Sequence, residues 1–163
     1  MHKLQWIQNK ILSREAMLQQ CNVWRASGYK VVFTNGCFDI LHHGHLSLLA
    51  SAADFGNKLV LALNTDASVK LLKGPERPIT HEQDRAFQAA SLLCVDAVCL
   101  FDEATPEELI KYLKPDVLVK GGDYTIDKII GADFVIANGG SVEIIPFVEG
   151  YSTTSIIGKI KKL

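Results

Sequence analysis

The sequence predicts an α/β protein with a Rossmann-like, doubly wound sheet of about five parallel strands and helices on both faces. Short, continuous runs of Val, Ile and Leu recur along the chain and are typical of strands buried on both faces. Segments with helical periodicity separate these runs, so strands and helices alternate. The 163 residues contain no internal repeat, low-complexity tract or linker. One domain with its own hydrophobic core is therefore expected.

The N-terminal segment, residues 4–27, carries apolar side chains among polar ones and predicts one or two amphipathic helices that end at Gly28. We therefore divide the chain into an N-terminal helical extension, residues 1–28, and a main domain, residues 29–163. The first strand of that domain is KVVFTN at 30–35. The helix after it is expected to begin near Gly44 and to end at Gly56.

The alternation then continues to the C-terminus. Further strands are expected at 58–64, 96–101, 115–122 and 141–147. Further helices are expected at 66–74, at 80–93 with Thr80 as the cap, at 105–113 with Pro106 in the first turn, in a short stretch before FVIANGG, and at 152–162. Every strand is thus followed by a helical segment, as a parallel sheet with crossover connections requires.

Composition excludes several classes of protein. The formal net charge of −1 argues against nucleic-acid binding by bulk electrostatics. No apolar run approaches the ~20 residues that span a membrane, and the N-terminus lacks the apolar core of a signal peptide. The four cysteines are too scattered for a zinc site or a disulfide framework: Cys21, Cys37, Cys94 and Cys99. A reducing, cytoplasmic location is expected.

Three of the five histidines lie within four residues, in the string TNGCFDILHHGHLSLL at 34–49. In doubly wound sheets, ligands bind outside the carboxyl ends of the strands, where the first strand here ends. The free N–H groups and dipole of the helix that follows attract anions. His42 and His45 are three residues apart and can grip one group, while Gly44 lets a ligand approach the backbone. His43 is expected to point elsewhere.

Three interpretations of these histidines remain open on the residues alone. As phosphate ligands, the imidazoles would donate hydrogen bonds and stabilise charge that grows in a transition state. As a metal pair, they would need a third or fourth ligand, and the sequence offers no nearby carboxylate beyond Asp39. As incidental residues, they would only start a helix. The helix dipole should oppose protonation of the empty site, and bound polyphosphate should favour it.

The string GCFDILHHGH resembles the signature of the nucleotidyltransferase superfamily with the HxGH motif. The likeness continues in order from about residue 28. NTDASVKLLKGPERPI, KPDVLVKGGDY, ANGG and EGYSTTSIIGKI are most similar to the adenylyltransferase domain that makes ADP-heptose from heptose 1-phosphate. That domain is often fused to a ribokinase-type sugar kinase, and these 163 residues hold no kinase half.

The resemblance implies transfer of AMP from ATP to D-glycero-β-D-manno-heptose 1-phosphate, with release of pyrophosphate, for bacterial lipopolysaccharide. It also implies Mg²⁺ bound mainly through the nucleotide phosphates, and a separate sugar kinase in the same pathway. Two other functions stay open: a glycerol-3-phosphate cytidylyltransferase that uses CTP, and a non-catalytic nucleotide-binding module. Cytidylyltransferases of that kind carry an arginine where this chain has Phe147. A homodimer is also left open.

The resemblance assigns roles residue by residue. It makes His42, His45 and Lys73 the catalytic set and directs Arg77 and Lys120 to the substrate phosphate. The expected nucleotide-binding positions are Asn35, Gly36, Cys37, Phe38, Gly44, Gly121, Asp123, Ser152, Thr153 and Thr154.

Several of these residues also have a plain structural interpretation. Lys73 could be a solvated helix-end lysine, and residues 121–123 could form only a tight turn. Ser152 and its neighbours could cap a helix while they bind phosphate. Arg85 is expected either at the surface or facing phosphate, and Asp39 to orient the loop by accepting backbone hydrogen bonds.

Overall fold

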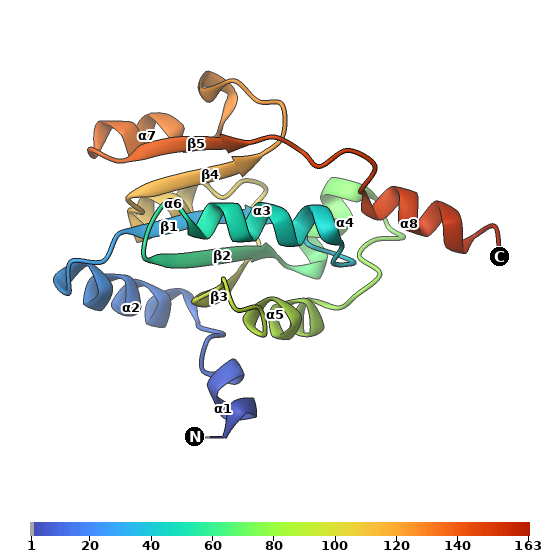
Figure 1. Cartoon of the computed structure of the whole chain (residues 1–163), viewed down its shortest axis with the longest axis horizontal. Coiled ribbons are helices and arrows are strands. Elements are labelled where there is room, and N and C mark those ends of the chain that lie inside the picture. The colour runs from blue at the N-terminus through green and yellow to red at the C-terminus, as the bar shows by residue number, and fades with distance from the viewer. Residues whose placement is uncertain (1) are drawn as a thin grey trace.

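The computed structural model describes residues 2–163 as a five-stranded sheet with helices on both faces (Figure 1). The strands are β1 Val31–Gly36, β2 Lys58–Asn64, β3 Ala97–Phe101, β4 Val117–Gly121 and β5 Ser141–Ile145. All neighbours pair in parallel, in the order β3-β2-β1-β4-β5. The predicted fold class is confirmed.

The helices follow the expected alternation with boundaries shifted by a few residues. They are α1 Lys3–Gln8, α2 Arg14–Ala26, α3 His43–Ala53, α4 Asp66–Lys73, α5 Glu82–Ala90, α6 Glu107–Leu113, α7 Ala132–Ala137 and α8 Thr153–Ile160, with a short 3₁₀ helix at Ile126–Lys128. The last strand stops before Pro146, which has no N–H to donate to the ladder.

The expected cap at Thr80 is wrong. α5 begins two residues later, with His81 at the N-cap position and no side-chain hydrogen bond there. The backbone of Thr80 is engaged elsewhere, because its N–H donates to Asp39 and its carbonyl accepts from Arg85. These two partners hold Thr80 in the preceding loop.

Two apolar clusters fill the space on either side of the sheet. One lies between the sheet and helices α2, α6 and α7, and the other lies mainly under α3 and α5. The N-terminal segment contributes to the first cluster, since Met17 and Cys21 of α2 are fully buried there. Ile11, between α1 and α2, forms a parallel bridge to Val98 on edge strand β3. The domain boundary at residue 28 stays a prediction, although this segment packs closely on the sheet.

Strand order reverses between β1 and β4, the point at which doubly wound sheets have a ligand-binding crevice outside the carboxyl ends of the strands. The chain moves from β1 outward through β2 to β3, and then returns to the other side of β1 to form β4 and β5. β1 pairs with β2 along its whole length, but with β4 only at Val32 and Phe33. The pairing of β1 with β4 therefore stops before the carboxyl ends of the two strands, where strand order reverses and where such sheets bind ligands.

Candidate active site

The histidine motif lies at the carboxyl end of β1, beside this crevice. His42 occupies the N-cap position of α3, and its Nδ1 accepts a hydrogen bond from the His45 N–H at 3.4 Å. An accepting Nδ1 leaves the proton of a neutral imidazole on Nε2. The cap therefore leaves Nε2–H of His42 free to donate to an anion. Burial lowers the pKa of His42, so the ring is neutral near pH 7.

His45 lies directly against His42. The two rings stack with centroids 3.8 Å apart and planes 18° from parallel. Burial, together with the neighbouring His42, lowers the pKa of His45 to about 4, against weaker opposing effects of the Ile40 carbonyl and Asp39. The expected resistance to protonation is present, and its main cause is burial. Nδ1 of His45 is buried without a hydrogen-bond partner, an uncommon state that points to function at this ring.

Three neighbouring positions shape the space around these rings. Phe38 adopts a left-handed backbone conformation (φ 46°), and its ring packs 4.8 Å from that of His45. A Cβ at Gly36 would lie 2.9 Å from the Phe38 ring, and one at Gly44 would lie 3.2 Å from the His42 ring. Both glycines therefore have a packing role, because each makes room for an aromatic ring of the motif. Their expected role in nucleotide binding stays a prediction.

Asp39 links the histidine motif to the loop between α4 and α5 through hydrogen bonds. Its buried carboxylate accepts hydrogen bonds from Arg77 Nε at 2.7 Å and from the backbone N–H groups of Ile79 and Thr80 at 2.8–2.9 Å. Burial acts to raise the pKa of Asp39, but these donors together hold it below its ordinary value. The expected role of Asp39, accepting backbone hydrogen bonds, is confirmed, and its partners lie about forty residues away.

Arg85 is neither at the surface nor facing phosphate, so the expectation for it is wrong. Its side chain is fully buried and donates to the carbonyls of Cys37, Asn64 and Thr80 and to the Asp66 carboxylate. One planar guanidinium therefore joins the loop after β1, the end of β2, the start of α4 and the loop before α5. Through its bond to the Cys37 carbonyl, Arg85 holds the loop that carries the histidine motif.

Three cations surround the crevice. Lys120, at the end of β4, donates to Asn35 Oδ1 of β1 at 3.1 Å, and burial lowers its pKa. Among the described residues no carboxylate pairs with it. Lys73, at the end of α4, is exposed, and its charge partly offsets the burial that raises the pKa of the Cys37 thiol. Arg77 presents the rest of its guanidinium beyond the Asp39 pair. These cations suit a polyanionic ligand.

The start of α8 lies beside the start of α3. Tyr151, directly before α8, has its Cβ 3.3 Å from where a Gly44 Cβ would lie, and its ring is 4.9 Å from that of His43. His43 thus faces Tyr151 rather than His42, in line with the expectation that it points elsewhere. Ser152 is the N-cap, and its Oγ accepts from the Ser155 N–H at 3.0 Å. Two helix N-termini therefore point toward one region, a favourable arrangement for phosphate.

The remaining expected positions lie just at or after the end of β4 and at the start of α8. Gly121 ends β4, and a Cβ there would lie 2.9 Å from Leu48 of α3, so this glycine lets α3 pack closely on the sheet. Asp123 is exposed in the following loop. Thr153 is the first residue of α8, and the exposed Thr154 follows it. All four lie on the carboxyl side of the sheet.

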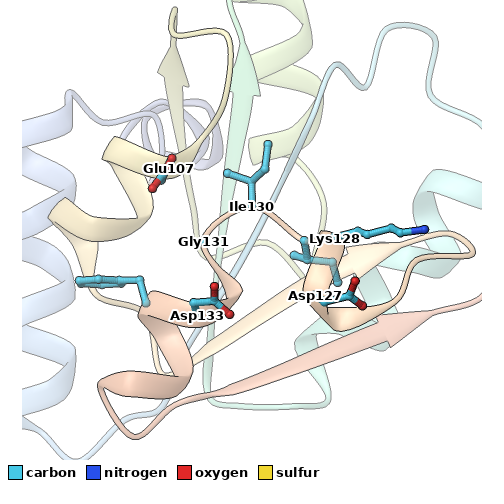
Figure 2. Close-up of a pocket in the computed structure, with 8 residues that line it drawn as sticks. Glu107, Asp127, Lys128, Ile130, Gly131 and Asp133 are labelled. Atoms are coloured by element: carbon cyan, nitrogen blue, oxygen red, sulfur yellow. The ribbon is translucent and has the colours of Figure 1, made fainter.

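The structure also contains a hollow elsewhere, lined mainly by residues of the 3₁₀ helix, α6 and α7 (Figure 2). Glu107, Asp127 and Asp133 line it with a single lysine, so its charge is unsuited to phosphates, and none of the expected site residues lies there. Within residues 2–163 no group of three His, Cys, Asp or Glu side chains converges as a protein-held metal would require. No helix in the same part of the chain is long and apolar enough to cross a membrane.

An imidazole pair at the start of α3, with Nε2–H of His42 free to donate, lies beside a second helix N-terminus and several cations, and this arrangement indicates the class of protein. The nearby Cys37 thiol has a pKa raised by burial, so it is not an activated nucleophile. Such a site aligns phosphates and stabilises charge, which is the chemistry of a nucleotidyltransferase.

Comparison with known proteins agrees with this assignment to the nucleotidyltransferases. Residues 33–159 match the family described as Cytidylyltransferase-like, and the chain belongs to this family. The resemblance of the HxGH string is thereby confirmed.

Individual relatives refine the comparison. The bifunctional protein HldE of Trichlorobacter lovleyi is 54% identical over 93% of this chain, and that of Syntrophotalea carbinolica is 52% identical over 98%. The chain spans 31% and 32% of the length of these two relatives. A crystal structure described as the lipopolysaccharide core biosynthesis protein of Thermoplasma volcanium has a TM-score of 0.59 and 27% identity, and the match covers 77% of this chain and 100% of that one.

Proposed function

We propose that this chain is the adenylyltransferase that joins AMP from ATP to D-glycero-β-D-manno-heptose 1-phosphate and releases pyrophosphate. The observation that carries the proposal is the stacked pair His42 and His45 at the start of α3, beside the β1–β4 crevice. The HldE relatives and the lipopolysaccharide core biosynthesis protein support a sugar-phosphate acceptor over other acceptors of this family.

The reaction needs alignment more than acid–base chemistry. An ionised oxygen of the sugar phosphate attacks the α-phosphorus of ATP, the bond from that phosphorus to the β-phosphate bridging oxygen breaks, and pyrophosphate carries away the charge. No proton has to move in this step, because both the attacking and the leaving oxygen are phosphate oxygens. Nε2–H of His42 donates to a phosphate oxygen, and the α3 N-terminus stabilises the charge that develops.

The three cations of the site bind different phosphate groups of the two substrates. Lys73 and Arg77 both follow β2, and we assign them to the β- and γ-phosphates. For Arg77 this replaces the role at the substrate phosphate that the sequence resemblance implied. Lys120 binds the phosphate of the acceptor. The Lys120 ammonium is buried beside a neutral amide, so an incoming anion offsets its desolvation cost. The hydroxyls of Ser152, Thr153 and Thr154 complete the phosphate contacts at the start of α8.

Magnesium fits this site as an ion held by the nucleotide phosphates and water. The carboxylate next to the motif, Asp39, is already engaged by Arg77 and two backbone N–H groups. Mg²⁺ commonly binds through substrate phosphates and water with few protein ligands, and there it would neutralise the leaving pyrophosphate. The acceptor is the product expected of a sugar kinase, in line with the resemblance to an adenylyltransferase domain that is often fused to one.

A substrate panel tests the proposal. The purified chain is mixed with Mg²⁺, with ATP or CTP, and with heptose 1-phosphate or glycerol 3-phosphate, and pyrophosphate release is measured. We expect release with ATP and heptose 1-phosphate. Release only with CTP and glycerol 3-phosphate would show a cytidylyltransferase instead. Nucleotide binding without pyrophosphate release for any acceptor would show a non-catalytic module.

A further inference from the structure

Two exposed aromatic rings converge at the carboxyl end of β4. Gly122 follows this strand, and its N–H donates to the Ile145 carbonyl at the end of β5. A Cβ at Gly122 would lie 2.9 Å from the Tyr124 ring and 3.0 Å from the Phe147 ring. The two rings come from different loops and meet over one backbone position. We call them the aromatic pair.

The exposure of these rings is not explained by packing. Tyr124 is 45% exposed and Phe147 is 66% exposed, and neither belongs to an apolar cluster of the core. Two large aromatic side chains that meet at the surface leave apolar area in water, at a cost that a flat ligand could offset. Their placement at the ligand-binding edge of the sheet makes a ligand the natural partner.

The aromatic pair lies on one flank of the site, and two of the three cations, Lys73 and Arg77, lie on the other. Lys73 and Arg77 follow β2, which neighbours β1 on one side, whereas Tyr124 and Phe147 follow β4 and β5 on its other side. His42 lies between the two flanks, at the end of β1. Across the sheet edge the order is therefore Lys73 and Arg77, the imidazoles, and the aromatic rings, with Lys120 at the end of β4 assigned to the acceptor phosphate. A nucleoside triphosphate has the matching order: the β- and γ-phosphates, then the α-phosphate and the sugar, and then the flat base.

We propose that Tyr124 and Phe147 bind the base of the nucleotide by stacking, and so fix its orientation with the triphosphate toward Lys73 and Arg77. This inference rests on the proposed function, since it assigns the base subsite of the same reaction. A purine offers these rings more area than a pyrimidine, so the aromatic pair also favours ATP over CTP. Base–aromatic stacking changes affinity by about 5- to 100-fold for each base.

The test separates base binding from phosphate binding. Equilibrium dissociation constants are measured by calorimetry for ATP and for inorganic tripolyphosphate, which has no base, with Mg²⁺ and without an acceptor. We expect Phe147→Ala and Tyr124→Ala each to raise the Kd for ATP by about 5- to 100-fold and the Kd for tripolyphosphate by less than about twofold. Phe147→Trp, which keeps a stacking surface, should retain ATP affinity.

A matched control is Phe55→Ala, which removes a 37% exposed ring just beyond α3, at the opposite end of that helix from the motif. It should change neither constant. Equal weakening of ATP and tripolyphosphate, no weakening of either, or a rise only in the KM for the sugar phosphate would overturn the inference. Because binding is measured without an acceptor, a chain that passes this test yet releases no pyrophosphate would fail the proposed function alone.

Discussion

His42 has two roles at the start of α3, as the helix cap and as the proposed phosphate donor. We expect His42→Ala to lower kcat/KM by about 100-fold, the size found when one electrostatic donor is removed. It should also lower the free energy of unfolding by ~1 kcal/mol, because the cap bond to the His45 N–H is lost. Steady-state pyrophosphate release and urea denaturation measure the two effects separately.

Two further variants sharpen this comparison. His42→Asn keeps a capping side chain but not the imidazole, so it should recover stability without recovering activity. His43→Ala removes the exposed neighbour that packs on Tyr151, and should leave turnover within a few fold of wild type. Activity lost equally at His42 and His43 would argue against a specific phosphate contact at His42.

The lowered pKa of His45 makes the folding stability of the chain depend on pH. Its pKa is lowered by burial from 6.5 to about 4 in the folded chain, so the unfolded chain binds more protons between these values. Stability therefore falls as pH drops from about 6.5 toward about 4, and is fully present above that window. His45→Gln should flatten this part of the pH–stability curve, measured by urea denaturation between pH 4 and pH 7.

Bound ATP should reverse the shift at His45, because polyphosphate favours the charged ring. A histidine NMR titration with and without ATP should show the His45 pKa rise on binding. A pKa that stays unchanged would place the phosphates away from this ring.

The sequence revealed the residues that act through a local motif and missed those that act through distant contacts. His42 and His45 were visible because three residues along a helix start place them on one site. Arg85 was not, since its partners Cys37 and Asn64 are brought to it only by the sheet. The Gly36 and Gly44 contacts also depend on ring positions that no spacing reveals.

At the scale of elements, Asp39 couples the motif to the loop between α4 and α5. An amide at this position has one acceptor oxygen, where the carboxylate serves Arg77, Ile79 and Thr80. We expect Asp39→Asn to lower stability by ~1–3 kcal/mol and to raise the KM for ATP by about tenfold, because Arg77 is no longer held. Chemical denaturation and ATP titrations of the rate check both effects.

The control for this variant is Asp54→Asn, an exposed carboxylate at the far end of α3. It should leave both quantities unchanged. An Asp39→Asn variant with wild-type KM and lowered stability would limit Asp39 to a role in folding.

The boundaries of helices and strands follow the local sequence pattern, except where tertiary hydrogen bonds override it. The strand at 58–64 was predicted to the residue because its apolar run is bounded on both sides by polar residues. The start of α5 was misplaced, since Asp39 and Arg85 engage the backbone of Thr80 and keep it outside the helix. A capping residue in the sequence cannot reveal such competing partners.

For the whole molecule, hydrophobic patterning predicted a parallel sheet, but not the strand order that opens the crevice. The order depends on which side of β1 the chain returns to after β3, a choice made by packing of the two helix layers. The parting of β1 from β4 after Phe33 is likewise visible only in the pairing. The site therefore follows from the motif together with a topology that single segments do not specify.

The N-terminal segment covers one face of the sheet and pairs with its β3 edge, so its removal should destabilise the whole fold. Deleting residues 1–28 would expose the apolar area that Met17 and Cys21 cover and leave the edge of β3 without its Ile11 bridge. We expect the truncated chain to lose cooperative unfolding. Met17→Ala is the milder probe and should cost ~2–5 kcal/mol, with kcat/KM unchanged at low temperature, because Met17 lies on the face opposite α3. Leu4→Ala, at a 58% exposed position of α1, is the control. A truncated chain with the wild-type denaturation midpoint would make the segment a dispensable extension.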